Sequence, residues 1–503
     1  MPVKLSQIER QIKGAYLRSS DANIIGISHD SRKITPGYAF AAVRGNINNG
    51  MDFVPDAIAK GASALIIAQK YRDLVEYYPQ IPVLFVPSVR QALGYISCMV
   101  YDNPSLSLGL VGITGTNGKT TTSFLLDSAL TKSSFTTGII GTIEFRSASR
   151  RSPSTFTTPE APDLQALLAE LVNNKVDVVS MEVSSHGLDQ RRVDGTFFKI
   201  GIFTNLTPEH LDYHGTIEQY YFTKAQLFAK ERCGFAIVNV DDPWGRRLAN
   251  QLEVPNITFG TSKNANYQIT DISVTAEGTQ FRLSNAVVAY SLSTKIVGAL
   301  NAMNATAAFL AAIKLGADPD LAIEGIASCE SVSGRFQKIE AGQPALTVVD
   351  YAHTPDSIAD LITTVRGLIP SGGRVIAVGG ARGGRDRLKR PALGRALATS
   401  DLAIITTDSP GEEDPHEIIS QIVLGTLDAI PRHVHIEPNR IDAIEFALEQ
   451  ATFGDAVVIV GRGHETSIRI GNTQVHLDDR EVVTQAAERL FGPVASPLVT
   501  TRN

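Results

Sequence analysis

A glycine-rich loop that ends in a lysine and a threonine has the clearest chemistry in this sequence. Residues 109–122 read GLVGITGTNGKTTT, an apolar run that leads into Gly118, Lys119 and Thr120. Glycines let backbone N–H groups approach an anion, the lysine reaches terminal phosphates, and the hydroxyl binds Mg²⁺. The spacing departs from the strict phosphate-loop pattern, since Gly112 lies one residue too far from Gly118. The loop still indicates a nucleotide-phosphate site rather than a purely structural turn.

A second polar cluster follows another buried apolar run. Residues 178–192 read VVSMEVSSHGLDQRR, which places Glu182 at the end of a predicted strand. A carboxylate at a strand tip beside a phosphate loop is an expected magnesium ligand, because Mg²⁺ takes hard oxygen donors. A helix N-cap made by Ser184 or Ser185 is the structural alternative. A serine nucleophile is not favoured, because no strained elbow motif surrounds these serines.

Two further segments could add to such a metal site. Residues 204–216 read TNLTPEHLDYHGT, with two histidines four residues apart. Pro208 interrupts a continuous helix, which argues against a zinc protease motif. Because the phosphate loop lies in the same domain, we favour a second Mg²⁺ held by a neutral histidine, with capping and turn formation as the alternative. Lys224 lies among aromatic residues, where burial would lower its pKa and let it form a carbamate with carbon dioxide. Taken alone, these residues fit a surface lysine with a packed stem better.

More polar clusters follow predicted strands near the C-terminus. Residues 350–355 (DYAHTP) and 461–465 (GRGHE) lie where ligands bind in parallel sheets, and Glu465 could hold a substrate ammonium. Residues 379–390 contain five cations in twelve positions. This run is either a solvated loop or an anion site, since arginine pairs bidentately with carboxylate or phosphate.

These clusters need a framework of strands, and the chain offers three blocks of them. Its 503 residues are too many for one core. We expect an α/β protein with a small N-terminal α/β domain (1–104), a central ATPase domain with a mostly parallel sheet (105–336), and a doubly wound, Rossmann-like C-terminal domain (337–503). Alternation of apolar and polar residues over 267–292 predicts antiparallel hairpins inserted into the central domain.

Composition excludes several classes of protein. The net charge of −6, with no basic stripe, argues against a nucleic-acid partner. No apolar run reaches 18 residues, so we expect no membrane span, and the N-terminus lacks a signal-peptide apolar region. Cys98, Cys233 and Cys329 are few and far apart, which predicts reduced, structural thiols in a cytoplasmic protein.

Together these motifs resemble the Mur ligase family. The ordered set includes GTNGKTT, TTP at 157–159, EVSSHGL from Glu182, TNL with HLD, Lys224, DYAHTP and GxGHE, and it spans nearly the whole chain. The MurE type, which adds the third residue of the peptidoglycan stem peptide to UDP-N-acetylmuramoyl-L-alanyl-D-glutamate, is the most similar. The resemblance implies a role in peptidoglycan synthesis, and so in cell wall biogenesis, cell shape and cell division.

The resemblance also implies ATP, Mg²⁺ and a carbamate on Lys224, in a monomer whose substrates are the muramoyl dipeptide and a diamino acid. The implied catalytic residues are Lys119, Glu182, His210 and Lys224. The implied metal ligands are Thr120, Glu182, His210 and carbamylated Lys224. Those for ATP are Gly115, Thr116, Asn117, Gly118, Lys119, Thr120, Thr121, Asn301, Asn304, Arg335 and Asp350. Those for the muramoyl dipeptide are Ser31, Asn46, Thr157, Thr158, Ser184, Gln190 and Arg192. Those for the amino acid are Arg385, Asp408, Ser409, Gly411, Gly461 and Glu465.

The implied reaction is an ATP-driven amide synthesis. ATP phosphorylates the D-glutamate carboxylate to an acyl phosphate, and the incoming amine displaces phosphate. Two positions depart from the family pattern. Phe156 stands where many relatives have asparagine, and Gly411 stands where enzymes that add meso-diaminopimelate usually have an arginine. Since residues 412–414 are all acidic, we expect the acceptor to be L-lysine, or another diamine such as L-ornithine. Meso-diaminopimelate is the alternative.

Two other classes of protein compete with this interpretation. One is a related amide ligase of folate or specialised metabolism, which Phe156 leaves open. The other is a catalytically silent nucleotide-binding regulator. Such a regulator would be expected to lack some of the catalytic side chains, and all four are present.

Overall fold

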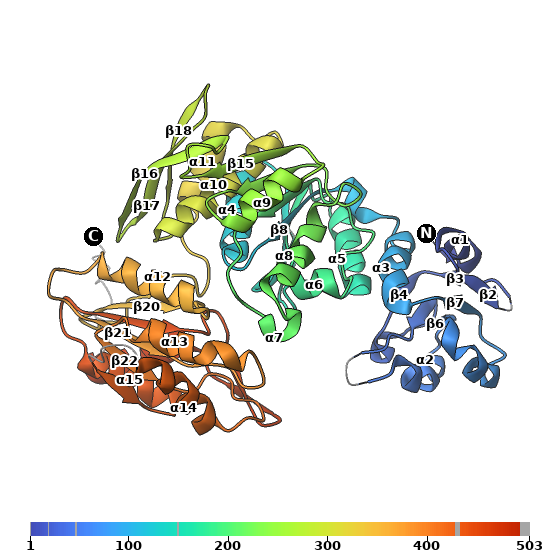
Figure 1. Ribbon diagram of the computed structural model, residues 1–503. Helices are drawn as coiled ribbons and strands as arrows, with labels where there is room; N and C mark the ends of the chain where they lie inside the picture. Colours follow the sequence, from blue (N-terminus) through green and yellow to red (C-terminus); the bar gives the residue numbers. More distant parts are fainter. Residues whose placement is uncertain (1, 19, 46–47, 148–149, 428–432, 493–503) are drawn as a thin grey trace, which may run out of the picture.

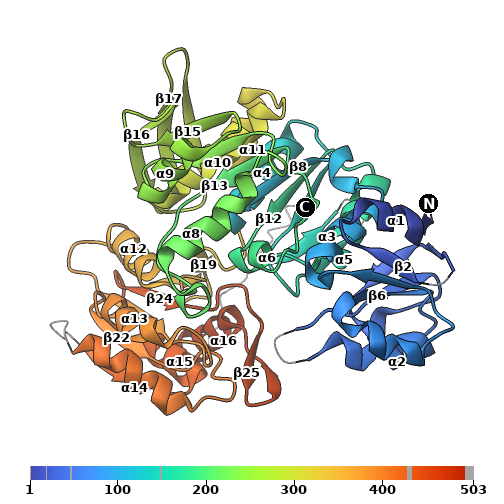
Figure 2. The same cartoon turned by 45° about the vertical axis from the view of Figure 1, so that its right-hand side comes forward.

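A computed structural model of the protein describes residues 2–18, 20–45, 48–147, 150–427 and 433–492. It contains three successive α/β units, each with its own sheet (Figure 1). The central unit contacts both of the others, and the turned view in Figure 2 shows the same arrangement. The predicted α/β fold class is confirmed.

The N-terminal unit is a small sheet covered by short helices. Its strands run in the order β2 (Tyr16–Arg18), β7 (Val83–Val86), β6 (Ala64–Ala68), β5 (Tyr38–Ala41) and β4 (Gly26–Ser28). A separate pair joins β1 (Val3–Lys4) to β3 (Asn23–Ile24). The helices are α1 (Leu5–Gln11), α2 (Val54–Ala59) and α3 (Val89–Val100). All residues of β6 and β7 are buried, as expected for parallel strands covered on both faces.

The central unit is built on a long, mostly parallel sheet. Its strands run in the order β11 (Arg151–Pro153), β10 (Glu144–Arg146), β9 (Thr137–Ile140), β12 (Val178–Glu182), β8 (Gly109–Thr114), β13 (Ile200–Phe203), β14 (Ala236–Asn239), β15 (Asn256–Gly260), β16 (Tyr267–Thr275), β17 (Gly278–Ser284) and β18 (Ala289–Thr294). The predicted hairpins are β16 to β18, and they extend the sheet at one edge. Because β12, β8 and β13 are parallel neighbours, their polar carboxyl ends meet at one edge of the sheet.

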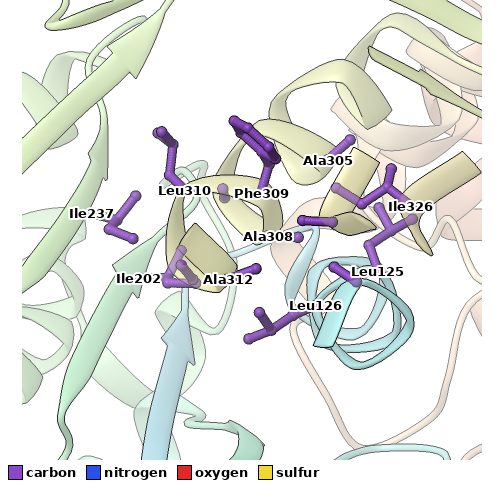
Figure 3. Close-up of a cluster of buried hydrophobic side chains, with 14 of the residues drawn as sticks. Leu125, Leu126, Ile202, Ile237, Ala305, Ala308, Phe309, Leu310, Ala312 and Ile326 are labelled. Atoms are coloured by element: carbon purple, nitrogen blue, oxygen red, sulfur yellow. The ribbon is translucent and has the colours of Figure 1, made fainter. Parts of the chain in front are cut away.

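The helices of the central unit pack on this sheet. They are α4 (Lys119–Lys132), α5 (Ala161–Asn173), α6 (Ser185–Asp189), α7 (Leu211–His214), α8 (Ile217–Ala225), α9 (Pro243–Gln251), α10 (Ala299–Lys314) and α11 (Pro319–Ser328). Figure 3 shows how α10 fits between the strands that carry Ile202 and Ile237 and helix α4 with Leu125 and Leu126. Alanines line the buried face of α10, and their small side chains allow this close packing.

The C-terminal unit is a second doubly wound sheet. Its strands run in the order β19 (Gln337–Ile339), β20 (Leu346–Asp350), β24 (Ala456–Val460), β21 (Val375–Gly379), β22 (Leu402–Ile405) and β23 (Val434–Ile436). The helices are α12 (Pro355–Arg366), α13 (Arg390–Leu397), α14 (Pro415–Thr426), α15 (Arg440–Gln450) and α16 (Asp479–Phe491). A hairpin of β25 (Ser467–Ile470) and β26 (Thr473–His476) follows β24.

The start of β8 and the state of the three cysteines bear on the expectations from the sequence. The apolar run Leu106–Ile113 of the sequence predicts a strand, but the strand begins at Gly109, because Pro104–Ser107 forms a turn of 3₁₀ helix. Cys98 and Cys233 are buried and Cys329 is half-buried, and all three are free thiols. In the described ranges, none of the helices combines the length and apolar character needed to cross a bilayer.

Candidate active site

A cleft of about 550 Å³ lies at the carboxyl ends of the central strands and is closed on one side by the C-terminal unit. Its lining comes from the glycine-rich loop, the segments after β12 and β13, and loops of the C-terminal sheet. A second hollow, of about 660 Å³, is lined by α4, β9 and the end of α11, away from these strand ends. The chemistry-bearing motifs gather at the first.

The phosphate loop is shaped by two glycines and held by strand β13. Gly115 and Gly118 have φ of +149° and +89°, and Gly118 caps α4. A Cβ at Gly115 would collide with the Thr204 hydroxyl, and one at Gly118 with the Asn304 amide. Asn205, which follows β13, accepts hydrogen bonds from the loop amides of Thr116 (2.9 Å) and Asn117 (2.9 Å). The start of α4 therefore presents backbone N–H groups in the geometry that binds phosphate.

Lys119 lies inside this loop. Its Nζ donates to the carbonyl oxygens of Gly115 (2.9 Å) and Thr116 (2.7 Å). Burial lowers the pKa of the Lys119 ammonium, while Glu209 and Glu182 act in the opposite direction. Its position at the start of α4 is where a lysine reaches terminal phosphates. Thr121, which the sequence also predicted to contact ATP, is buried in the first turn of α4.

Glu182 ends β12 directly beside the loop, and its side chain is 1% exposed. Its carboxylate accepts hydrogen bonds from the Thr120 hydroxyl (3.0 Å) and from the amide (2.8 Å) and hydroxyl (2.9 Å) of Thr142. A Cβ at Gly141 would overlap the carboxylate. Thr120 and Glu182 thus form a compact oxygen donor set suited to Mg²⁺.

Lys224 reaches the loop from α8, and His210 lines the same cleft. Burial lowers the pKa of the His210 imidazole to about 3, which leaves the ring neutral and able to bind a metal. The Lys224 side chain is 1% exposed, so the interpretation as a surface lysine is wrong. Its Nζ donates to Gly115 O (2.9 Å) and lies 4.5 Å from the centre of the Tyr220 ring. Burial, with nearby Lys119, holds its pKa well below the usual range.

The side chains assigned to the muramoyl peptide form one wall of the cleft. The Thr158 hydroxyl donates to Glu182 O (3.0 Å), and the Arg192 guanidinium donates to Thr158 O (2.8 Å) and Gln190 Oε1 (2.7 Å). Thr157 and Ser184 also line the cleft. The N-cap alternative is confirmed as well, since the Ser184 hydroxyl accepts from the amide of Gly187 (3.0 Å).

The two predicted uridine contacts are separate from this wall. Ser31 is buried in the N-terminal unit, in a short 3₁₀ helix capped by Asp30, and it does not line the cleft. Asn46 lies outside the described residues. The N-terminal unit is tied to the cleft wall by an ion pair between Arg90 on α3 and Glu160 (2.6 Å), and Glu160 also pairs with Arg192 (3.0 Å).

The side chains assigned to the ATP nucleoside lie on the other flank of the loop. Asn304 donates to Asn301 (2.9 Å) beside Gly118. Arg335 donates to the Thr120 hydroxyl (3.3 Å) and stacks over the Tyr351 ring at 4.4 Å. Asp350, at the end of β20, accepts from the amides of Phe336 and Ala352 at 2.6 Å each, and burial raises its pKa.

The amino-acid set gathers around one arginine that the sequence did not single out. Arg382 pairs with the half-buried Glu465 and lies 3.9 Å from the buried Asp408. These three side chains form a group of opposite charges at the edge of the cleft. Burial raises the pKa of Asp408, but Arg382 and its neighbours outweigh this and hold it low. Arg385 lines the cleft nearby. The backbone at Gly461 passes close to the Asp408 carboxylate.

The acidic loop expected to face the acceptor has other partners. Glu413 receives a two-point hydrogen bond from Arg390, with both distances 2.8 Å, and one from the amide of Gly384 (2.8 Å). Asp414 caps α14, and Glu412 lies 3.5 Å from Arg469. The expectation that these acids form an ammonium pocket is therefore wrong. Ser409 and Gly411, in the same loop, hydrogen-bond to the backbone of Arg469.

Sequence reasoning also missed a bond between the last two units. His353 Nδ1 donates to Tyr351 O (2.9 Å), and its Nε2 lies 2.6 Å from the Glu209 carboxylate. Burial disfavours the charge on Glu209, but His353, His210 and Lys119 outweigh it and hold the pKa well below its usual range. Both residues lie in motifs quoted above, but nothing in the spacing pairs them.

Family models match three consecutive parts of the chain. They are the Mur ligase family catalytic domain over residues 23–101, the Mur ligase middle domain over 113–312, and the Mur ligase glutamate ligase domain over 334–463. The matches cover all three units.

Curated relatives and solved structures agree with these matches. The chain is 37% identical to the UDP-N-acetylmuramoyl-L-alanyl-D-glutamate--2,6-diaminopimelate ligase of Geobacillus kaustophilus over 97% of this chain and 99% of that protein. It is 38% identical to the protein of the same name from Streptomyces avermitilis, over 95% of each. A solved structure of such a ligase superposes with a TM-score of 0.66 at 30% identity, covering 97% of this chain and 99% of that one. MurF from Acinetobacter baumannii shares the fold, with a TM-score of 0.67 at 21% identity. The chain belongs to the Mur ligase family and is an ATP-dependent acid–amino-acid ligase.

Proposed function

We propose that the protein adds meso-diaminopimelate to the D-glutamate side chain of UDP-N-acetylmuramoyl-L-alanyl-D-glutamate in peptidoglycan precursor synthesis. This replaces the L-lysine expected from the sequence. The relatives that match nearly the whole chain at 36–38% identity are named as diaminopimelate ligases.

The observation that carries the choice of acceptor is the charge of the pocket. Glu412, Glu413 and Asp414 are taken up by other groups, whereas Arg385 lines the cleft beside Arg382, which pairs with Glu465. Diaminopimelate differs from lysine by a second carboxylate. That carboxylate needs a cationic partner, and arginine is the side chain best suited to it.

The arrangement supports a two-step amide synthesis. The D-glutamate carboxylate attacks the γ-phosphorus of ATP, and ADP leaves with the electron pair of the broken P–O bond. The acceptor amine, after losing a proton, attacks the acyl carbon, and phosphate leaves. The N-terminus of α4 and Lys119 hold the phosphates in line, and Arg335 lies where it can neutralise charge beside Thr120.

We propose that Thr120, Glu182 and His210 hold Mg²⁺ and that a carbamate on Lys224 supports a second Mg²⁺. Bound Mg²⁺ neutralises charge on the transferring phosphoryl group. No three His, Cys, Asp or Glu side chains in the described part of the chain cluster as a metal site by themselves. Mg²⁺ is usually held by one or two carboxylates together with substrate phosphates. Burial lowers the pKa of Lys224 and so favours its neutral amine, which is the form that takes up carbon dioxide.

We propose that the protein acts as a monomer in the cytoplasm, where ATP is available. Ser31 and Asn46 remain the proposed contacts of the uridine end. The predicted boundaries near residues 104 and 336 remain proposals for where the domains divide.

Phosphate release decides the acceptor. The protein is supplied with ATP, Mg²⁺, the UDP-muramoyl dipeptide and one of meso-diaminopimelate, L-lysine or L-ornithine. We expect kcat/KM for diaminopimelate to exceed that for lysine by at least tenfold. The variant Arg385→Gln should raise the KM for diaminopimelate, and Arg366→Gln, at an exposed arginine on α12, serves as control. Faster turnover with lysine would overturn the proposal.

A further inference from the structure

Phe156 is an apolar side chain in a polar cleft. It lines the cleft, and 52% of its surface is exposed. The neighbouring lining residues on this wall are Thr157, Gln190 and Arg192. An aromatic ring left open in such a site offers apolar contact area to a ligand.

The ring is supported on one side by a fixed cation. The guanidinium carbon of Arg192 lies 5.0 Å from the centre of the Phe156 ring, within the range of a cation–π contact. Arg192 cannot easily turn away, because its guanidinium forms an ion pair with Glu160 (3.0 Å) and donates hydrogen bonds to Thr158 O (2.8 Å) and Gln190 Oε1 (2.7 Å). Phe156 therefore presents a preorganised apolar surface to the cleft.

Its place in the cleft lies between the reacting end and the N-terminal unit. On one side, Thr157 contacts the Thr142 hydroxyl (3.0 Å), which in turn donates to Glu182 (2.9 Å). On the other side, Arg192 leads through Glu160 to Arg90 on α3. A substrate that reaches from Glu182 toward the N-terminal unit has to pass Phe156 with its middle portion.

We propose that Phe156 forms an apolar subsite for the methyl group of the L-alanyl residue of the muramoyl dipeptide. The inference rests on the proposed function, in which the D-glutamate carboxylate reacts at the magnesium site that includes Glu182 and the uridine end binds at the N-terminal unit. L-alanine then lies one residue from the reacting carboxylate, at the level of Phe156. Its methyl group is the apolar part of the substrate nearest the reaction, and the ring shields it from water.

The test compares two substrates that differ by this methyl group. The kcat/KM is measured by phosphate release for the UDP-muramoyl dipeptide and for its analogue with glycine in place of L-alanine. One hydrocarbon group in an apolar pocket is worth about 10–200-fold, and a half-open site lies at the low end. We expect wild-type protein to prefer the alanyl substrate about tenfold.

Three variants separate contact from general damage. Phe156→Ala should reduce the preference to about twofold or less, whereas Phe156→Leu should keep most of it. Phe453→Ala, an exposed phenylalanine in the C-terminal unit, should leave it unchanged. A ratio of two substrates on one protein cancels losses of folded material, and the KM for ATP should stay constant.

The outcomes distinguish this subsite from the proposed function. If wild-type protein turns over both substrates equally well, or if Phe156→Ala keeps the tenfold preference, the subsite is wrong while the ligase function stands. An equal loss on both substrates would mean that the ring contacts another part of the ligand, and would also refute the subsite. No phosphate release with either substrate would remove the proposed function, and this subsite with it.

Discussion

Replacing the carboxylate of Glu413 should loosen the loop that carries the acceptor site. Glu413 is 6% exposed at its side chain and pairs with Arg390, which is fully buried. It also accepts a hydrogen bond from the amide of Gly384, in the segment that contains Arg382 and Arg385. The variant Glu413→Gln keeps the shape of the side chain but removes its charge, and so leaves the Arg390 cation without an anionic partner.

Two lines of reasoning give the magnitude. Hydrogen bonds from Arg390 lower the pKa of Glu413 from 4.5 to about 2. At about 1.4 kcal/mol per pH unit this difference corresponds to about 3 kcal/mol, which solvent at the edge of the pair reduces. Removing one member of a buried pair costs about 3–5 kcal/mol. Since Arg390 keeps Gln421 as a partner, we expect a loss of about 2–3 kcal/mol.

The same pair predicts a pH dependence. The pKa of Glu413 is depressed in the folded state, so its stabilisation is complete above the unfolded value near 4.5. It is lost as pH falls from there toward about 2. The wild type and the variant should therefore differ at neutral pH and converge in acid.

Hydrogen exchange followed by mass spectrometry measures this locally. Amides of 382–390 and 415–426 should exchange about 30–150-fold faster in Glu413→Gln at pH 7, which is 2–3 kcal/mol at 1.4 kcal/mol per factor of ten. Glu412→Gln is the matched control. That neighbouring acid is 73% exposed and lies 3.5 Å from an exposed arginine, so its loss should change little. Equal exchange in the two variants would refute the argument that Glu413 is committed to Arg390.

Three other variants test the reaction centre. Lys119→Ala should lower kcat for phosphate release at least 10²-fold, because the phosphates lose their buried cation, and unchanged turnover would exclude its proposed role. Lys224→Ala should abolish activity and regain part of it with added formate or acetate, while full activity without them would remove the carbamate. His353→Ala breaks the bond to Glu209 and should raise the KM for the amino acid more than the KM for ATP. Steady-state kinetics with each substrate varied would show equal changes in both if His353 were merely structural.

The sequence predicted the parts of the fold that depend on local pattern. Short apolar runs such as Val83–Val86 and Ala236–Asn239 are strands with these bounds in the structure. Glycine spacing and the lysine indicated the phosphate loop. The pattern is informative because the loop leaves no room for a side chain at Gly115 or Gly118. The carboxyl ends of parallel strands meet at one edge, so Glu182 beside the loop also followed from order along the chain.

The rest depended on contacts between distant segments. Five cations in residues 379–390 look alike in sequence, and only the fold buries Arg390 against Glu413 and directs Arg382 to Glu465. Three consecutive acids suggested an acidic pocket. That prediction was wrong because the partners of these acids lie elsewhere in the chain and cannot be read from the local sequence. Burial likewise decided Lys224, because its sequence neighbours alone favoured a surface position.

The bond between Glu209 and His353 and that from the amide of Asp386 to Asp212 (3.2 Å) join the central and C-terminal units across the cleft. Both contacts are polar, so water can replace them when the two units part. A bulky nucleotide product can then leave when one unit rotates away from the other. The rate of this domain motion, rather than the affinity for the product, would then limit kcat.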